Sequence, residues 1–388
     1  MTRALCTATV LWMIAGGTAN PLRAQWIPDP QIDEKIQRGI DEIYNLQFYD
    51  ANKTFDEVIR LRPDHPAGYF FRAMIQWWRI LTNFDDESQD GRFYEMLQKV
   101  VDMCNRRLEK DPGDVTALFF KGGALGFSGR LRVDRNSWIP AIEDGVAALP
   151  AIRKAYKLDP NNYDVLLGIG IYNYYADIIP EEYPIVKPFM IFLPSGDRRK
   201  GLEQLHLAAE KAKYARVEAQ YFLLQTYFLY EKDYLKALSL AEALHAHYPR
   251  NPLFHRYLGR CEVTLGRWDL AGKIFTDVET RYREGMLGYD TYDGREAYYY
   301  LGRWNLLNSR YDASMKDFRR CDSLSQLIDK DGPSGFAAMT HLAIGMLLDL
   351  KGDRAGAVAE YRKVLAMKEY GTSHVDAKRF LKSPYVRY

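Results

Sequence analysis

Two arginines follow an aspartate at a point where a helix is expected to begin. Gly196, Asp197, Arg198 and Arg199 precede a segment with helical apolar periodicity. The unpaired N–H groups of a helix N-terminus, together with two guanidinium groups, could hold a phosphate or a carboxylate. The aspartate could instead accept hydrogen bonds from those N–H groups and cap the helix. We favour the cap for Asp197, and we keep Arg198 and Arg199 as candidate binding residues.

Other motifs that would predict catalysis or metal binding are missing from the sequence. The seven histidines are scattered, and none belongs to an HExxH pattern, which would place two ligands on one helix face. Gly168 and Gly170 resemble part of a dinucleotide-binding loop, but no strand is predicted before them and the third glycine is missing. The chain also lacks a Gly-x-Ser-x-Gly turn and a phosphate-binding Gly-Lys-Ser loop. We therefore predict no metal, no cofactor and no catalytic residue.

Aromatic side chains are better candidates for a binding surface. Several tyrosines cluster in segments that we expect to be the first helices of helical hairpins, and such helices line the concave side of a stacked-hairpin fold. Outward-facing tyrosines would give rigid, amphipathic contacts to a peptide or a sugar chain. Adjacent residues of a helix point in different directions, so part of each cluster must be core. The candidates are Tyr172, Tyr174, Tyr175, Tyr221 and Tyr298.

A repeated spacing indicates the elements that must position these residues. A glycine is followed twelve positions later by a small residue and four positions after that by an aromatic, as in Gly39, Ala51 and Phe55. Two antiparallel helices can approach closely where side chains are short, and the aromatic fills the next layer. We expect a helical hairpin at each occurrence. The spacing recurs at Gly259, Ala271 and Phe275, at Gly302, Ser314 and Phe318, and at Gly345, Ala357 and Tyr361.

Prolines and Asn or Asp turns mark where successive hairpins join. The sequence predicts eight hairpins, approximately over residues 32–65, 66–114, 115–162, 163–215, 218–251, 252–284, 295–327 and 336–370. A final helix over 373–382 would cover the last apolar face, as a solenoid requires. The expected fold is all-α, a right-handed α-α superhelix. We expect one continuous solenoid whose hairpins carry long insertions over 25–215 and are regular over 216–388.

Three consecutive hairpins, the second to the fourth, carry insertions between their two helices, so we expect the insertions to be neighbours along one edge. The first, over 83–91, is acidic; the second, over 128–140, is basic and aromatic; the third, over 177–197, is apolar and rich in proline. The charged turns could bind a partner or neutralise each other. The apolar insertion could pack internally or, if exposed, contact a partner or a membrane. The candidate residues are Arg130, Arg132, Arg135, Trp138, Phe189 and Phe192.

The N-terminus has the features of an export signal. Arg3 precedes an apolar stretch from Ala4 to Ala15, which small and helix-breaking residues follow. That stretch is shorter than the roughly 20 residues of a spanning helix. We therefore expect a cleaved leader, with cleavage after Ala24 or after Ala19. Residues 1–24 would then be a signal peptide, and the mature protein would be exported to the periplasm or the outer membrane.

The charge balance argues against a nucleic-acid partner. Loss of residues 1–24 would remove Arg3 and Arg23, and the 53 basic residues would become 51, equal to the 51 acidic ones. A duplex-binding surface normally shows as a clustered basic excess, which is not visible in the sequence.

Three cysteines would remain in the mature chain, Cys104, Cys261 and Cys321, each inside a predicted helix. An odd number cannot pair completely within one chain. We expect buried, apolar thiols that face the helix interfaces, with an intermolecular disulfide as the alternative.

Residues 163–210 carry a narrower signature. It comprises the segment from Gly168 to Tyr175, the apolar insertion, and the segment from Pro194 to Leu202. With the small-aromatic spacing and the turn prolines, the mature chain resembles tetratricopeptide repeat proteins, whose period is 34 residues. The signature is similar to that of a bacterial exported group and, more remotely, of the tetratricopeptide repeat protein 39 family and its fungal inclusion-body clearance relatives. The resemblance implies an all-helical scaffold without catalytic residues, and it does not identify a partner.

Our leading interpretation is a monomeric, exported, non-enzymatic scaffold that binds a protein or peptide of the cell envelope through the concave tyrosines and the insertion edge. The paired Lys and Asn residues with which some tetratricopeptide proteins hold a C-terminal carboxylate are not found, so that mode is not predicted. An alternative is a membrane-surface or lipid-associated factor that uses residues 178–194. A remote alternative is a carbohydrate-active enzyme, which would need two carboxyl groups about 5 to 10 Å apart across a closed cleft.

Overall fold

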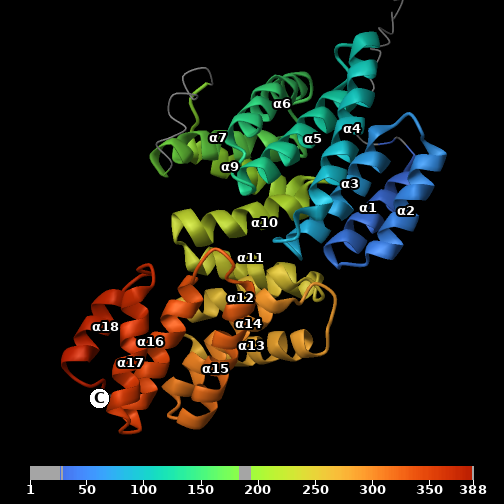
Figure 1. Cartoon of the computed structure of the whole chain (residues 1–388). Helices are drawn as coiled ribbons and strands as arrows, with labels where there is room; N and C mark the ends of the chain where they lie inside the picture. The colour runs from blue at the N-terminus through green and yellow to red at the C-terminus, as the bar shows by residue number, and fades with distance from the viewer. Residues whose placement is uncertain (1–26, 28, 183–193, 387–388) are drawn as a thin grey trace, which may run out of the picture.

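A computed structural model of the chain describes residues 27, 29–182 and 194–386, and within these ranges the secondary structure is helical and contains no strand. The all-α fold is confirmed. In the same ranges the helices form eight antiparallel hairpins and a final single helix, wound as a superhelix (Figure 1). The hairpins are α1 (Pro30–Tyr44) with α2 (Phe48–Leu61), α3 (Pro66–Leu81) with α4 (Asp90–Lys110), α5 (Val115–Asp134) with α6 (Trp138–Leu158), α7 (Val165–Glu182) with α9 (Arg198–Lys211), α10 (Arg216–Thr226) with α11 (Tyr234–His247), α12 (Pro252–Thr264) with α13 (Trp268–Arg283), α14 (Thr291–Leu307) with α15 (Tyr311–Ile328), and α16 (Gly335–Leu350) with α17 (Arg354–Ala366).

The starts of many helices are encoded locally. Pro30, Pro66 and Pro252 each occupy the first turn of a helix, where the N–H that proline lacks would have no partner within the helix. Polar side chains accept hydrogen bonds from the free N–H groups of other first turns. Asp197 does so at the start of α9, where its carboxylate accepts from the Lys200 N–H at 2.9 Å, which confirms the predicted cap.

The contact between the glycine and the aromatic residue is present in each hairpin that carries the spacing. A Cβ built on Gly39 would lie 2.5 Å from Cζ of Phe55, and one on Gly345 would lie 2.5 Å from Cε1 of Tyr361. The closest Phe275 atom would lie 2.7 Å from a Cβ on Gly259, and the closest Phe318 atom 2.8 Å from one on Gly302. Because these distances exclude any side chain, the ring occupies the notch that glycine leaves. The small residues between them, Ala51, Ala271, Ser314 and Ala357, are buried as predicted.

The last helix lies where the sequence predicts it. The helix α18 runs over Ser373–Lys382 and packs on α17, with the Phe380 and Tyr361 rings 5.6 Å apart. Arg354 donates to the carbonyl oxygens of Phe380 and Leu381, both at 2.8 Å, and so provides partners for carbonyls at the C-terminal end of α18. The apolar end of the solenoid is thereby covered.

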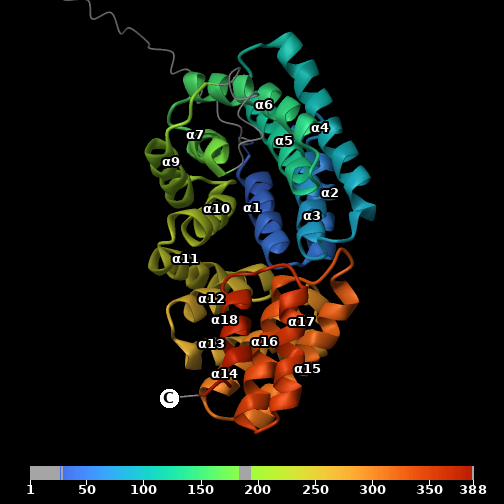
Figure 2. The ribbon, with the colours of Figure 1, turned by 60° about the vertical axis from the view of Figure 1, so that its left-hand side comes forward.

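The helix α1 does more than begin the first hairpin, because it also packs against α10, α11 and α12. Figure 2 shows α1 between α3 and α10. Along its length, Asp33 accepts from the Tyr214 hydroxyl at 2.8 Å and Asp41 accepts from the Tyr248 hydroxyl at 2.8 Å. At its end, the Tyr44 carbonyl accepts from the side chain of Asn251, which caps α12. The superhelix therefore closes on its own first helix.

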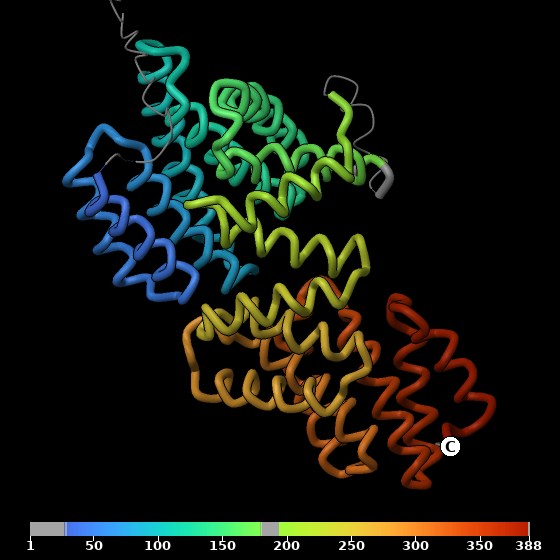
Figure 3. The backbone as a smooth tube through the Cα atoms, turned by 180° about the vertical axis from the view of Figure 1, so that it is seen from behind, coloured from blue at the N-terminus to red at the C-terminus, as the bar shows by residue number. Residues whose placement is uncertain are grey.

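Tyr44 is the centre of this closure. Its ring lies 5.1 Å from the Trp78 ring and 5.5 Å from the Tyr248 ring, and its hydroxyl donates to the Glu218 carboxylate at 3.0 Å. Glu218 is buried and also pairs with Arg130 of α5 at 3.3 Å. One connected hydrophobic core consequently spans residues 27–261. The helices α10 to α12 lie between the N-terminal and C-terminal hairpins (Figure 3).

The second insertion differs from the prediction. Residues 128–140 were expected to form a long turn, but α5 continues to Asp134 and α6 begins at Trp138. The helices extend because Asp144 of α6 accepts from the Ser128 hydroxyl at 2.6 Å and from Arg132 at 2.8 Å, which holds the two helix ends together. The first insertion does lengthen a turn, over residues 82–89.

Replacing a notch glycine by leucine is expected to separate its hairpin. Gly259→Leu would place side-chain atoms inside the Phe275 ring, which is fully buried and cannot swing away. We expect a loss of about 1–3 kcal/mol in the free energy of unfolding, measured by urea denaturation. The control is Gly126→Leu in α5, because a Cβ there meets no atom within 4 Å. That change should be neutral or stabilise by up to about 0.8 kcal/mol through helix propensity. Equal losses in the two variants would contradict the notch.

Removing the Tyr44 hydroxyl is expected to weaken the closure. In Tyr44→Phe the buried Glu218 carboxylate loses a hydrogen-bond donor, which should lower the free energy of unfolding by about 1–3 kcal/mol. Tyr49→Phe, in the same hairpin, removes a hydroxyl from a side chain that is 81% exposed and should leave stability unchanged. Urea denaturation of both variants tests the difference, and an unaffected Tyr44→Phe protein would show that this hydrogen bond does not support the closure.

Candidate functional site

The candidate tyrosines do not form a concave binding surface. Tyr174, Tyr221 and Tyr298 are 0%, 2% and 5% exposed, and Tyr172 and Tyr175 are half-buried. The Tyr174 hydroxyl donates to Glu231 at 2.6 Å, and the Tyr221 ring packs in the closed core. The expectation fails because Tyr221 lies in the core that α1 closes, and Tyr174 packs against Tyr230 of the next hairpin. The tyrosine clusters are mainly core.

The acidic and the basic insertion contact each other through an ion pair. Arg135 donates to Asp90 at 2.6 Å, so the basic and acidic segments are neighbours and neutralise each other, which was one of the two alternatives. Arg132 pairs with Asp144, and Arg130 pairs with Glu218 beneath the Phe222 ring, 4.5 Å from its centroid. These three arginines therefore support the packing. Trp138 is half-buried at the start of α6.

The third insertion lies largely outside the described residues, including Phe189 and Phe192. At its far side, Arg198 donates two hydrogen bonds to Glu231, at 2.8 and 2.7 Å, while Arg199 is exposed and lies 3.6 Å from Glu203. None of the helices in the described ranges is long and apolar enough to cross a membrane.

The three cysteines among the residues that the structure describes, Cys104, Cys261 and Cys321, are buried and free, as predicted. Burial raises the pKa of the Cys104 and Cys261 thiols to about 12, and that of Cys321 to about 11. We identified no group of three or more metal-ligating side chains among the described residues.

A pocket of about 280 Å³ lies where the turn after α3 meets the first helices of the later hairpins. We call it the α12–α14 pocket. One side is the turn, which was predicted to lie at an outer edge but here reaches α12 and α14. Its lining mixes aromatic and charged side chains. They include Phe84 and Asp85 from the turn, Arg256 and Arg260 from α12, Tyr292, Asp293, Arg295 and Glu296 from α14, and Phe336 from α16.

Ion pairs between consecutive hairpins set the geometry of the α12–α14 pocket. Arg256 Nη1 lies 3.0 Å from Asp293 Oδ1, and Arg260 Nη2 donates to Glu296 Oε2 at 2.6 Å. Arg295 in turn donates to Asp329 at 2.7 Å and lies over the Phe336 ring, 4.8 Å from its centroid. The first two pairs link α12 to α14 of the next hairpin, and the third links α14 to the junction between α15 and α16, so the stacking of three hairpins fixes the pocket wall.

Two buried donors of these arginines make no hydrogen bond. The Nε atoms of Arg256 and Arg295 have no hydrogen-bond acceptor among the residues that the structure describes, although Arg256 Nε lies 3.7 Å from Glu296 Oε2. Such groups are costly when unpaired, and both atoms are covered by the protein itself. Asp293 and Glu296 supply acceptors beside them. The α12–α14 pocket therefore offers both donors and acceptors between aromatic side chains.

Residues 226–285 match the model of the tetratricopeptide repeat family. This chain contains tetratricopeptide repeats. None of the curated proteins matches its sequence.

Several solved structures are similar to the chain. One is from the APC/C hetero-tetramer Cut9-Hcn1, with 14% identity, coverage of 86% of this chain and 52% of that chain, and a TM-score of 0.47. Pseudomonas aeruginosa pilF has 13% identity, coverage of 68% and 97%, and a TM-score of 0.44. The C-terminal part of a TPR repeat-containing protein from Cytophaga hutchinsonii has 15% identity, coverage of 76% and 97%, and a TM-score of 0.37. This chain spans about half the length of the first of these.

Sequence reasoning missed the residues of the α12–α14 pocket, although the repeats left a signal. Arg260 and Glu296 are 36 residues apart, and Arg295 and Asp329 are 34 apart, close to the tetratricopeptide period. Opposite charges about one repeat period apart indicate ion pairs between a first helix and the next repeat, or the junction that leads to it. The narrower resemblance to the tetratricopeptide repeat protein 39 family stays a prediction.

Burial changes the proton affinity of Asp293 in this pocket. Loss of water raises the pKa of the Asp293 carboxyl from 3.8 to about 7, although Arg256 acts in the opposite direction, and the neighbouring Asp290 raises it further. Glu296 differs, because Arg260 and Arg256 together hold the pKa of its carboxyl below the ordinary value despite burial.

The shift makes stability depend on pH. The folded protein keeps the Asp293 proton in a range, between pH 3.8 and about 7, where the unfolded chain has released it. This contribution to stability is therefore fully present below that range and is lost as the pH rises through it. Asp293→Asn cannot ionise. The free energy of unfolding of the variant, relative to the native protein, should rise between about pH 5 and about pH 7, by at most about 1.4 kcal/mol per pH unit. Urea denaturation across this range measures it, and parallel profiles would contradict the shift.

Proposed function

We propose that the chain is a non-enzymatic tetratricopeptide scaffold of the cell envelope, and that it holds an extended segment of a protein partner in the α12–α14 pocket. The coarse part of this proposal, a scaffold for protein interactions, is supported by the repeats themselves. The export signal predicted over residues 1–24 supports the envelope location. The pocket replaces the N-terminal concave face as the binding site, because α1 packs against the helices where a partner was expected.

The observation that carries the proposal is the lining of the α12–α14 pocket, in which arginines and carboxylates lie beside aromatic side chains. A peptide backbone carries both acceptors and donors, since each residue other than proline has one C=O and one N–H. Guanidinium groups in the pocket lining would donate to carbonyl oxygens, and the Asp293 carboxylate would accept from an N–H. A simple anion would meet the nearby carboxylates, and a simple cation would meet the arginines, so neither satisfies both sets of groups.

The size and walls of the pocket agree with a peptide anchor. Its volume of about 280 Å³ is below the range of about 300–1,000 Å³ typical of small-molecule sites. Phe84, Tyr292 and Phe336 would surround an apolar side chain of the partner, as aromatic residues do at protein interfaces. Its carboxylates pair with arginines, an arrangement suited to recognition. These features support a protein partner over catalysis.

Site-specific photocrosslinking would test the proposed function. A benzoylphenylalanine introduced in place of Tyr292 would lie in the wall of the α12–α14 pocket, and the same residue in place of Tyr49 would lie on an exposed surface of the first hairpin. In intact cells we expect one defined protein adduct from position 292 and none from position 49, detected by immunoblotting and mass spectrometry.

The adduct should depend on the pocket. Phe84→Ala in the position-292 background should reduce its yield several-fold, because the opposite wall is lost, whereas Tyr49→Ala should not. Identical adducts from positions 292 and 49, or an adduct that Phe84→Ala leaves unchanged, would contradict a partner in this pocket. Fractionation of the same cells tests the envelope location.

A further inference from the structure

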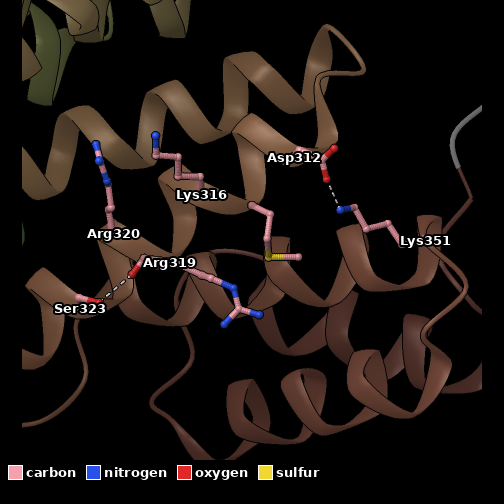
Figure 4. A pocket seen from close by; sticks show the side chains of 7 residues that line it. Asp312, Lys316, Arg319, Arg320, Ser323 and Lys351 are labelled. Carbon is pink, nitrogen blue, oxygen red and sulfur yellow. Dashed lines mark hydrogen bonds and ion pairs between the residues drawn. The ribbon is translucent and has the colours of Figure 1, made fainter.

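A second concave surface lies on α15, apart from the α12–α14 pocket. It is an open groove of about 450 Å³, which we call the α15 groove (Figure 4). Six of its residues come from α15 itself, and Lys351 comes from the turn after α16. Along α15 they recur at helical spacing and form one stripe. The polar members of the stripe are Asp312, Lys316, Arg319, Arg320 and Ser323.

The α15 groove has a local excess of positive charge in a protein that is close to neutral. Four cationic side chains and one carboxylate line it. Asp312 is already paired with Lys351, as Figure 4 shows. Arg320 contacts Glu279 at 3.6 Å and the Tyr298 hydroxyl at 3.1 Å. Lys316 and Arg319 are exposed, and neither side chain has an ion pair with the described part of the chain. Two cations therefore remain available to an incoming anion.

We propose that the α15 groove binds an acidic segment of a protein partner. The charge of the groove calls for carboxylates, and Ser323 adds a hydroxyl at one end of the stripe. Leu327, one turn further along the same face, is 69% exposed and gives an apolar contact beside the charges. The matching segment has several acidic residues followed or preceded by an apolar one.

The length of the stripe favours a peptide. From position 312 to position 323 it extends about 16 Å at about 1.5 Å per helical residue. An extended peptide covers this distance with about five residues, at about 3.3 Å each. The cations follow a line along α15 and the neighbouring turn, and an extended chain can match such a line of charge along its length. A duplex would need a larger basic footprint than these four side chains supply.

Charge reversal on the stripe tests the proposal. The groove variant is Lys316→Glu with Arg319→Glu; the matched control is Arg362→Glu with Lys378→Glu, which reverses two exposed cations on α17 and α18 and changes the net charge equally. The probe is a fluorescein-labelled peptide of five glutamates and one leucine, and binding is followed by fluorescence anisotropy. Thermal unfolding of both variants checks that they are folded.

The native protein should bind this peptide, more weakly as salt is added, because exposed charges are screened. The groove variant should bind about tenfold more weakly or worse, since two attractions become repulsions, and the control should change less than about twofold. Absence of binding to the native protein, or equal weakening in the two variants, would overturn the proposal. So would stronger groove-dependent binding to phosphatidylglycerol vesicles or to a single-stranded oligonucleotide than to the peptide.

Discussion

The architecture depends on the contact between a glycine of one helix and an aromatic ring of the next. At Gly39, Gly259, Gly302 and Gly345 the ring fills the space of a missing side chain, so the two helix axes approach closely and the hairpin has one packing geometry. Repetition of nearly the same hairpin turns the stack into a superhelix, because each small rotation between neighbours adds to the last. That curvature brings α1 against α10 to α12.

The closure determines which surfaces remain for binding. When α1 packs against the later helices, it brings Tyr44 and the charged Glu218–Arg130 pair into the core, and burial raises the pKa of the Glu218 carboxyl despite the arginine. Aromatic residues of the first helices in the N-terminal half, Tyr221 among them, become core residues for the same reason. The C-terminal hairpins keep the α12–α14 pocket, which their first helices line, and the α15 groove, which a second helix lines.

The hairpins could be predicted from the sequence because their determinants are local. The spacing of Gly259, Ala271 and Phe275 lies within one hairpin, and the final helix over 373–382 follows from its own apolar pattern and Pro384.

The closure could not be predicted, since the contacts of Tyr44 with Glu218 and Asn251 join residues 174 and 207 positions apart and follow no periodicity. The α12–α14 pocket could not be predicted for the same reason. Phe84 and Arg256 are far apart in the sequence, and they line one pocket only because the superhelix closes. The basic segment was predicted to be a turn because the third hairpin needs an insertion to keep the repeat spacing, whereas hydrogen bonds from Ser128 and Arg132 to Asp144 hold it in longer helices.

Stability alone does not explain the buried charges of the α12–α14 pocket. Removing two ions from water costs about as much as their attraction returns, and well-packed apolar residues are often equally stabilising in such places. The Arg295–Asp329 pair is completed by the Ser334 hydroxyl, which donates to Asp329 at 2.6 Å, and it suits a role in fixing the stacking of two repeats. The Arg256–Asp293 pair differs, because burial raises the pKa of the Asp293 carboxyl to about 7 and so brings it near its protonation midpoint at neutral pH. The two pairs also differ in what they join. The Arg295–Asp329 pair joins α14 to the junction between α15 and α16, whereas the Arg256–Asp293 pair joins α12 to α14 at the wall of the α12–α14 pocket.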